Sequence, residues 1–567
     1  MFLKDRVKAL AQQQRAAAIA FLLCLPVFPA VYKSDRGAVV SRSTLASEVG
    51  RDILKQGGNA FDAAVATGFA LAVTYPSAGN LGGGGFAVIR LSSGECRALD
   101  FRETAPKSVS AQTYLDKNGQ VRDKLLTLHT LGSGVPGTVD GLLLLHKTYG
   151  TLPLRDLINP AIQLAGEGFV LPASLVESFG RQLNDMKRHP ASMDVFTNGG
   201  TAYRNGDRWV QRDLMRTLKR IAGKGRAGFY EGKTAELIVR EMKRTGGAIT
   251  LEDLKAYRSI WREPVRGSYR GYQIISMPPP SSGGVLLVQM LNMLEDKQPG
   301  KLGWGHPDLV HWMIEAERLA FADRAVYLGD PDFNPLPVEQ LIDKQYAKSR
   351  MNTVELMKAG DSSAIAEGKL PYESPETTHF SVMDRDGNIV AITTTLNLPY
   401  GNKIVVPGAG FLLNNEMDDF AVKAGVANSF GLLGSRLNLV EGGKRMLSSM
   451  APTILLGPDE SMAVYGAPGG SAIITTVLQV TVNLIDHKMT LDQAIRAPRF
   501  HHQWKPDQVL FEPFALNPAL RENLTKRGHK KLVPCEVYIS DVNGILYKNG
   551  LFEAVTDPRH DALPGAQ

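Results

Sequence analysis

Cysteine is scarce in this chain: its 567 residues include only three, at positions 24, 96 and 535. A framework of several disulfides is therefore excluded. Cys24 lies in the apolar run near the N-terminus, so the sequence allows at most one disulfide, between Cys96 and Cys535. A chain of this length can instead bury a large hydrophobic core.

Strong charge and long apolar runs are also missing. The net charge is +7, and residues 1–30 supply four basic side chains against one acidic side chain. The remainder is too weakly basic to indicate nucleic acid as a partner. After residue 30 no run reaches the roughly 20 apolar residues that a membrane-spanning helix needs. The composition is that of a globular protein, and length alone suggests three or four domains of about 150 residues.

The N-terminus has the pattern of an export signal. Basic residues precede the apolar run at 16–25, and Pro26, Pro29 and Ala30 follow it. The run is short and is followed by prolines, which favours a cleaved signal peptide over residues 1–30. Retention of residues 16–30 as a membrane anchor is the alternative. We therefore expect a periplasmic or secreted protein.

Motifs for nucleotides and metals are incomplete. The glycines of Gly79–Gly85 lack the Gly-Lys-Ser/Thr ending of a phosphate-binding loop and the spacing of a dinucleotide fingerprint. His501 and His502 have no partner at a recognisable metal-ligand spacing. The sequence predicts neither a cofactor nor a metal.

Helical and extended patterns divide the rest of the chain. Small apolar residues at helical spacing predict a buried helix over Glu48–Thr74, and a glycine turn at 80–85 leads into a strand ending near Arg90. Residues 153–350 are predicted to be largely helical, with glycine and proline punctuation at 278–284. Residues 351–376 are polar and typical of a loop.

Strands dominate from Thr377 onward. Thr377–Met383 and Ile389–Thr395 flank a segment containing Asp386-Gly387, a strong hairpin signal. A five-residue loop places Thr377 opposite Thr395, and a two-residue loop shifts the register by one. Either register puts Thr395 beside Thr377.

Thr377 follows the Glu376 carbonyl and carries a hydroxyl nucleophile. If the Glu376–Thr377 bond is cut, Thr377 gains a free α-amine, whose ordinary pKa of about 7.7–8.0 suits it as the base for its own hydroxyl. The heptapeptide alone is equally typical of a strand rich in β-branched residues.

Four further segments carry polar groups that suit a small zwitterionic substrate. Arg102 can bind a carboxylate through two parallel hydrogen bonds, although a structural ion pair is the ordinary alternative. Residues 413–420 hold three carboxylates, which suit an ammonium group, a solvated turn or a calcium loop. Residues 445–450 hold two adjacent serines. The glycine turn at 466–470 precedes a predicted helix at 471–479, an arrangement that suits an oxyanion.

Together these segments resemble the γ-glutamyltranspeptidase family, from Gly37 to Asp557-Pro558-Arg559. The ordered motifs that carry the resemblance are Asp100–Glu103, Ala322–Ala325, Thr377–Val382, Thr395–Asn397, Asn414–Phe420, Leu447–Met450 and Pro468–Ser471. The resemblance implies an α+β fold of the N-terminal-nucleophile hydrolase type, a four-layer αββα sandwich. It also implies a precursor that cuts itself into a large subunit, 31–376, and a small subunit, 377–567. Both would form one structural domain, in place of the three or four that length suggests.

The resemblance further implies roles for individual residues. Thr377 would attack the γ-carbonyl of glutathione or another γ-glutamyl compound, and water or the amine of an amino acid or dipeptide would resolve the ester. Thr395 would hydrogen-bond the nucleophile, and Gly469 and Gly470 would stabilise the oxyanion. The donor would be held at its α-carboxylate by Arg102, Ser448 and Ser449, and at its α-amine by Asn397, Glu416 and Asp419.

The polar, glycine-rich segment 424–443 resembles the lid loop of bacterial members of the family. Its aromatic residue is Phe430, where we expect tyrosine in the enterobacterial enzymes, so any hydrogen bond from that hydroxyl is lost here. Two alternatives to a transpeptidase remain: an acylase acting on glutaryl-type β-lactam side chains, and a catalytically silent periplasmic binder. Asp419 argues against the acylase, since an uncharged acyl tail would leave its carboxylate buried and unpaired.

Overall fold

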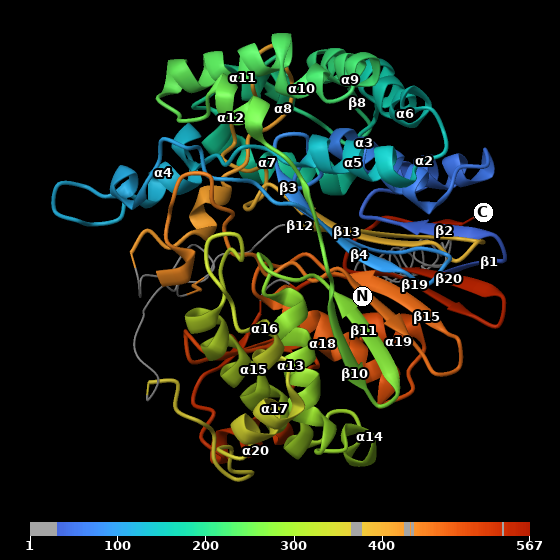
Figure 1. The fold of residues 1–567 in the computed structure, drawn as a ribbon, viewed down its shortest axis with the longest axis vertical. Coiled ribbons are helices and arrows are strands. Elements are labelled where there is room, and N and C mark those ends of the chain that lie inside the picture. Colours follow the sequence, from blue (N-terminus) through green and yellow to red (C-terminus); the bar gives the residue numbers. More distant parts are fainter. Residues whose placement is uncertain (1–30, 364–376, 424–430, 433–435, 536–537, 567) are drawn as a thin grey trace, which may run out of the picture. The chain divides into compact units, whose positions relative to one another are not determined.

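Two seven-stranded antiparallel sheets stacked face to face form the centre of the protein (Figure 1). The structure is a computed structural model that describes residues 31–363, 377–423, 431–432, 436–535 and 538–566. In order across the first sheet, the strands are β21 (Gly565–Ala566), β2 (Gly37–Val40), β12 (Thr377–Asp384), β13 (Ile389–Thr395), β3 (Gly84–Arg90), β4 (Cys96–Phe101) and β9 (Ile260–Arg262). Across the second, they are β1 (Val31–Ser34), β20 (Leu551–Thr556), β19 (Asn543–Lys548), β15 (Met462–Gly466), β14 (Thr453–Leu456), β11 (Tyr272–Ser276) and β10 (Val265–Tyr269).

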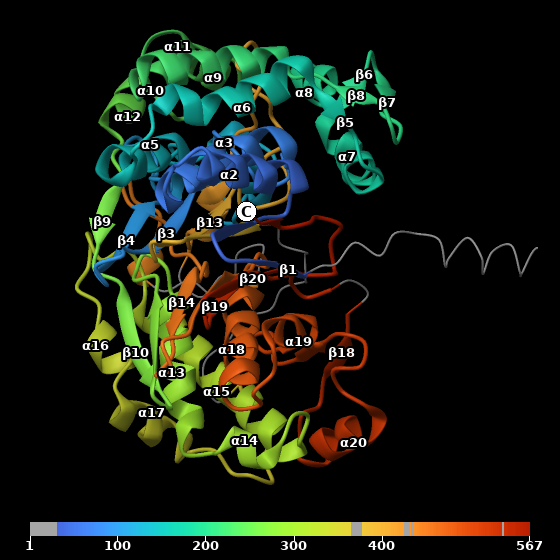
Figure 2. The ribbon, with the colours of Figure 1, turned by 90° about the vertical axis from the view of Figure 1, so that its right-hand side faces the viewer.

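Helices cover the outer face of each sheet, which confirms the predicted four-layer αββα arrangement (Figures 1 and 2). Over the first sheet lie α2 (Thr44–Lys55), α3 (Ala60–Thr74) and α5 (Thr138–Tyr149), and farther out α6 (Leu154–Glu167), α9 (Arg212–Lys224), α10 (Ala227–Tyr230), α11 (Gly232–Thr245) and α12 (Leu251–Ala256). Over the second lie α13 (Gly283–Glu295), α15 (Pro307–Tyr327), α17 (Lys344–Met351), α18 (Ala472–Ile485), α19 (Leu491–Arg496) and α20 (Pro518–Lys526). Further helices are α4 (Asp123–Thr127), α7 (Ala173–Met186), α8 (Pro190–Phe196), α14 (Pro299–Leu302) and α16 (Val338–Leu341).

Strand periodicity decides what each face of β12 meets. Successive side chains point to opposite faces of a sheet. Phe380 and Val382 join the core beneath the helices of the first sheet, whereas Met383 joins the core that extends between the sheets. Thr377 shares the face of Met383 and therefore lies between the two sheets, at the start of its strand.

Two sequence predictions need correction. The expected single helix over Glu48–Thr74 is two helices, because α2 ends before Gly57, which has a positive φ of 92°, and Asn59 caps the start of α3. The region 153–350 is largely helical but also supplies β9, β10 and β11 to the two central sheets. The predicted hairpin is confirmed, with Thr377 paired to Thr395 as for the five-residue loop.

Both sheets mix strands from before and after Thr377. In the first sheet β12 and β13 lie between β2 and β3, and in the second β20 pairs with β1 and β14 pairs with β11. Residues 31–567 accordingly form one compact unit.

Two further sequence predictions concern disulfides and the membrane. Cys96 and Cys535 are free, so the single disulfide that the sequence allowed does not form in this structure. Within the described ranges, no helix is long and apolar enough to cross a bilayer. The predicted signal peptide at 1–30 lies outside the described residues.

Candidate active site

One pocket at the end of the hairpin brings most of the predicted site residues together. Thr377 and Thr395, which face each other across the β12–β13 ladder, both line it, and Thr377 is 5% exposed. The complete lining consists of Arg102, Arg324, Thr377, Thr395, Asn397, Glu416, Asp419, Leu432, Ser448, Ser449, Met450, Gly470, Ser471 and Ile473. Gly469 is adjacent in sequence to this lining. Glu376 and Phe430 lie outside the described residues.

Hydrogen bonds fix the second strand of the hairpin where it enters the pocket. Thr395 Oγ1 accepts from the Asn397 backbone N–H at 2.8 Å, and the Asn80 side chain donates to the Thr395 carbonyl at 2.9 Å. Asn397 has a positive φ of 76°, and its amide donates to the Asn415 carbonyl at 3.0 Å. The turn after β13 is thus tied to the acidic segment that follows Asn415.

The predicted carboxylate and ammonium binders contact each other directly. Arg102 follows β4 and donates through its two terminal nitrogens to Glu416 and Asp419, which lie on the 3₁₀ turn η3 (Glu416–Asp419). Arg102 and Glu416 are almost completely buried. These partners are more than 300 residues apart in sequence, so the sequence predicted their chemistry but not their pairing.

The charges of this group shift one another's protonation. Burial alone would lower the pKa of the Arg102 guanidinium. The negative charges of Glu416, Asp419 and Glu103 raise this pKa by more than burial lowers it, so the net shift is upward. Burial also raises the pKa of Glu416 well above its usual value, against the opposing effect of Arg102. Arg102 therefore stays charged, while the carboxyl groups around it compete for a proton.

A second arginine, Arg324, completes the opposite wall. It comes from α15, and its guanidinium donates to Ser282 Oγ at 2.9 Å and to Ser449 Oγ at 3.4 Å. Burial lowers its pKa to about 10. Ser282 also donates to the Ser448 carbonyl at 2.7 Å, which fixes the two serines. The sequence placed Arg324 only within a matching motif and gave it no role.

The glycine turn before α18 borders the pocket through Gly470 and Ser471. Gly469 and Gly470 have φ values of 130° and 55°, a region that favours glycine. Their carbonyls accept from the N–H groups of Ala472 and Ile473 in the first turn of α18. In a trans peptide the N–H points opposite to the carbonyl, so the Gly470 and Ser471 N–H groups point away from the helix. This geometry suits a developing oxyanion.

The described part of the predicted lid segment also contacts the pocket. Leu432 lines the pocket, and Asn438 donates to the Asp419 carbonyl at 2.7 Å while accepting from the Leu447 N–H at 2.9 Å. Residues 424–430 and 433–435 lie outside the described residues.

The histidines at 501 and 502 have partners within the protein. His501 Nδ1 lies 2.8 Å from Thr475 Oγ1 and its Nε2 lies 2.9 Å from Gln503 Oε1. The Ser471 hydroxyl donates to the same Gln503 oxygen at 2.6 Å. These contacts support the start of α18 from behind the pocket.

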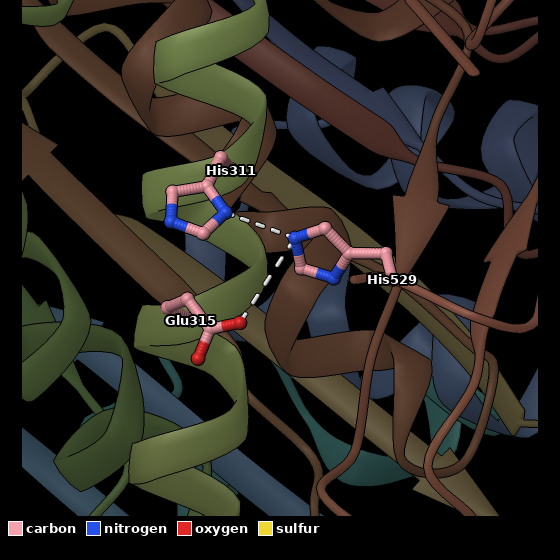
Figure 3. Close-up of side chains that lie close together, drawn as sticks. All are labelled: His311, Glu315 and His529. Carbon is pink, nitrogen blue, oxygen red and sulfur yellow. Dashed lines mark hydrogen bonds and ion pairs between the residues drawn. The ribbon is translucent and has the colours of Figure 1, made fainter. Parts of the chain in front are cut away.

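A separate buried polar cluster lies on α15, formed by His311, Glu315, Arg318 and His529, and we call it the α15 clamp. His311 Nδ1 lies 2.9 Å from His529 Nε2, and Glu315 lies close to both rings (Figure 3). Glu315 accepts from Arg318 Nε at 3.1 Å and from the Gly360 N–H at 3.2 Å, and His311 Nε2 lies 3.0 Å from the Glu355 carbonyl.

Arg318 extends the clamp by donating to Ser362 and Asp507. Successive turns of α15 thereby hold residues 355–362, which directly precede the segment leading to Thr377. The sequence did not predict that these residues would be in contact, since His529 is 218 residues from His311.

Comparisons with known proteins identify the family of this chain. A sequence model of the γ-glutamyltranspeptidase family matches residues 46–565. The chain is 46% identical over 531 residues to a glutathione hydrolase proenzyme of Escherichia coli, covering 93% of this chain and 91% of that protein. Among solved structures, the γ-glutamyltranspeptidase of Helicobacter pylori is 48% identical with a TM-score of 0.56, covering 58% of this chain and 95% of that one. A cephalosporin acylase of Bacillus halodurans is 28% identical with a TM-score of 0.84, covering 96% of this chain and 98% of that one. The chain therefore belongs to the γ-glutamyltranspeptidase family.

Proposed function

We propose that this protein is a γ-glutamyltranspeptidase and glutathione hydrolase that matures by cutting itself between Glu376 and Thr377. The observation that carries the proposal is the position of Thr377: it begins β12 in register with Thr395, in a pocket that also holds Arg102 and the carboxylates of η3. The family's precursor relatives support the cut. The products would be a large subunit of residues 31–376 and a small subunit of residues 377–567, and the predicted signal peptide would direct the precursor out of the cytoplasm.

Self-cleavage would use the Thr377 hydroxyl against the carbonyl before it. The Oγ atom attacks the Glu376 carbonyl carbon, the C–N bond breaks, and the freed nitrogen takes up a proton as the new α-amine. Water then hydrolyses the resulting ester and releases the Glu376 carboxylate. The same hydroxyl is thereby freed for substrate.

In the mature protein the Thr377 α-amine would act as the base for its own hydroxyl. The Oγ atom attacks the γ-carbonyl of the donor, and the Gly469 and Gly470 N–H groups stabilise the oxyanion. The orientation of the Gly470 N–H away from α18 supports its role, and the role of Gly469 is carried over from the family resemblance. The leaving amine departs with a proton, which leaves a γ-glutamyl ester. Water, or the amine of an amino acid or dipeptide, then resolves the ester.

Donor recognition would exchange the internal ion pairs for two external ones. The α-ammonium of the donor takes Glu416, Asp419 and the Asn397 side chain, and its α-carboxylate takes Arg102 with Ser448 and Ser449. We add Arg324 on the carboxylate side, because it hydrogen-bonds Ser449. A zwitterion can separate Arg102 from its acidic partners without leaving either side buried and unpaired.

The same argument disfavours a glutaryl acylase, although a cephalosporin acylase shares the fold. A glutaryl group carries a carboxylate but no amine. It would draw Arg102 away from Glu416 and Asp419 and offer those buried carboxylates nothing in return.

Two measurements test the proposal. Purified wild-type protein should give two bands on a denaturing gel, with Thr377 as the first residue of the lighter chain, and should hydrolyse a γ-glutamyl anilide faster when glycylglycine is present. Thr377→Ala should give one uncut, inactive chain. Thr378→Val is the matched control, because the Thr378 side chain points to the opposite face of β12. This variant should cut itself and hydrolyse the anilide as wild type does. Activity in Thr377→Ala, or a different first residue, would refute the proposal.

A further inference from the structure

Behind the pocket wall, a third carboxyl group faces Arg102. Glu103 is completely buried, and its Oε2 lies 3.8 Å from Arg102 Nη1. The side chain occupies space left by Gly84, where a Cβ atom would come within 2.5 Å of the same oxygen. Glu103, Glu416 and Asp419 therefore surround a single guanidinium. Glu103 does not line the pocket, and neither the family resemblance nor the proposed mechanism gives it a task.

Three oxygens of this group lack a hydrogen-bond donor of good geometry. In the described part of the chain these are both oxygens of Glu103 and Oε2 of Glu416. The backbone N–H of Glu103 itself approaches its own carboxyl group. Both carboxyl groups nevertheless approach the same nitrogen, Arg102 Nη1: Glu416 accepts a hydrogen bond from it, and Glu103 Oε2 lies 3.8 Å away. Two ionised carboxylates that approach one nitrogen repel each other, whereas one proton between them supplies the missing donor.

The charges facing Glu103 from the surrounding elements favour that proton. Among the described residues, Arg102, from its own segment, is the cation that forms an ion pair with it. Glu416 and Asp419 approach from η3, and Tyr257, whose hydroxyl donates to the Arg102 carbonyl at 2.8 Å, follows α12. Arg324, from α15, also lines the pocket. Burial raises the pKa of Glu103 to about 7, against the opposing charge of Arg102.

We propose that Glu103 is a positioning residue that shares one proton with Glu416 until a donor binds, and that the pair releases this proton when the donor's α-ammonium arrives. The inference rests on the proposed function, since it requires the ammonium to occupy the carboxylate side of the pocket. The binding reaction conserves protons: the site with one proton shared by Glu103 and Glu416 binds the zwitterionic donor, and that proton is released to solvent. The substrate ammonium thus replaces a proton as the counter-charge of Glu416.

Proton release makes affinity depend on pH. A ligand that binds only after a proton leaves binds more tightly as pH rises, until the site is already deprotonated. Affinity for the donor end should therefore rise about tenfold from pH 6 to pH 7.5 and change little above that. Glu103→Gln keeps the shape and offers Glu416 a permanent N–H donor, so its affinity should be nearly flat with pH.

The test is calorimetric titration of L-glutamate into the mature wild-type protein at pH 6, in buffers of different ionisation enthalpy. We expect release of about one proton per bound ligand. Glu103→Gln should release close to none, and the matched control Glu317→Gln, a buried glutamate on α15 outside the pocket, should behave as wild type. Inhibition constants of L-glutamate against anilide hydrolysis, measured from pH 5.5 to 8, give a second readout.

The outcomes separate this inference from the proposed function. If wild-type protein hydrolyses the anilide but binds L-glutamate without releasing a proton, the role of Glu103 is refuted and the transpeptidase stands. Wild-type protein that neither hydrolyses the anilide nor binds L-glutamate refutes both. The wild-type proton count decides the question even if Glu103→Gln does not fold.

Discussion

The protein buries two clusters of charged side chains, and they differ in how their charges are satisfied. In the α15 clamp the one carboxylate, Glu315, has an arginine and a backbone N–H as donors. In the second cluster, which we call the pocket group and which consists of Arg102, Glu103, Glu416 and Asp419, one guanidinium faces three carboxyl groups. Neither oxygen of Glu103 has a hydrogen-bond donor of good geometry among the described residues. Unsatisfied buried groups destabilise a fold, so we interpret the clamp as structural support and the pocket group as a site whose missing partner is a ligand.

The largest expected effect comes from breaking the clamp. Arg318→Met leaves the buried Glu315 without its cation, removes the contact to the exposed Asp507, and should lower the free energy of unfolding by about 3–5 kcal/mol. Urea denaturation of the uncut Thr377→Ala precursor measures it, because a single chain then unfolds. Arg496→Met removes an exposed ion pair with Asp492 and should change stability by less than about 1 kcal/mol. Equal losses in the two variants would contradict the role of the clamp.

Breaking the pocket group should affect catalysis and leave stability intact. Asp419→Asn removes one charge from a cluster with excess carboxyl groups, so the melting temperature should hold or rise. The donor ammonium loses a charged partner, and kcat/KM for a γ-glutamyl anilide should fall about 100-fold. Steady-state kinetics and thermal melts of the same preparation test both halves. A variant that melts early yet keeps its KM would reverse the assignment of the two clusters.

The smallest expected effect is an opposite response of the two clusters to pH. Burial lowers the pKa of His311 to about 4 and of His529 to about 3, from 6.5, so the unfolded chain takes up protons that the folded clamp refuses. The stability contributed by these histidines is therefore complete above pH 6.5 and declines as pH falls toward 4.

Glu103 responds with the reverse sign. Its pKa is raised by burial from 4.5 to about 7, so the folded protein keeps a proton that the unfolded chain has lost. This contribution is complete below pH 4.5 and is lost as pH rises through 7. Thermal melts from pH 4.5 to 7.5 should show a shallower acid-side decline than wild type in the double variant His311→Gln, His529→Gln, and a steeper decline over the same range in Glu103→Gln. Identical profiles in all three proteins would contradict this difference.

Local features of the fold could be predicted from sequence. The register of the β12–β13 hairpin follows from the loop length and the two-residue period, and the glycine turn before α18 follows from its composition. The break at Gly57 was missed because the pattern of small apolar residues continues across it. Strands β9–β11 were missed because they are short and lie among helices.

Long-range contacts could not be predicted in the same way. The sequence indicated that Arg102, Glu416 and Asp419 serve a zwitterion, but not that they pair with one another, because the pairing depends on how β4 and η3 meet in three dimensions. The α15 clamp and the burial of Glu103 arise likewise from packing among segments far apart in the chain.

Strands from before and after Thr377 are mixed within each sheet, and this arrangement has a consequence for how the protein is assembled. In the mature protein that we propose, the small subunit begins at Thr377 and contains β12 and β13. These strands fill the middle of a sheet whose neighbouring strands, β2 and β3, would belong to the large subunit. The two subunits cannot dissociate on dilution unless the hydrogen bonds between neighbouring strands of both sheets break. Pieces that have been parted must find each other again with no covalent link to align them. The intact precursor is therefore the template for assembly, and each mature molecule is put together only once.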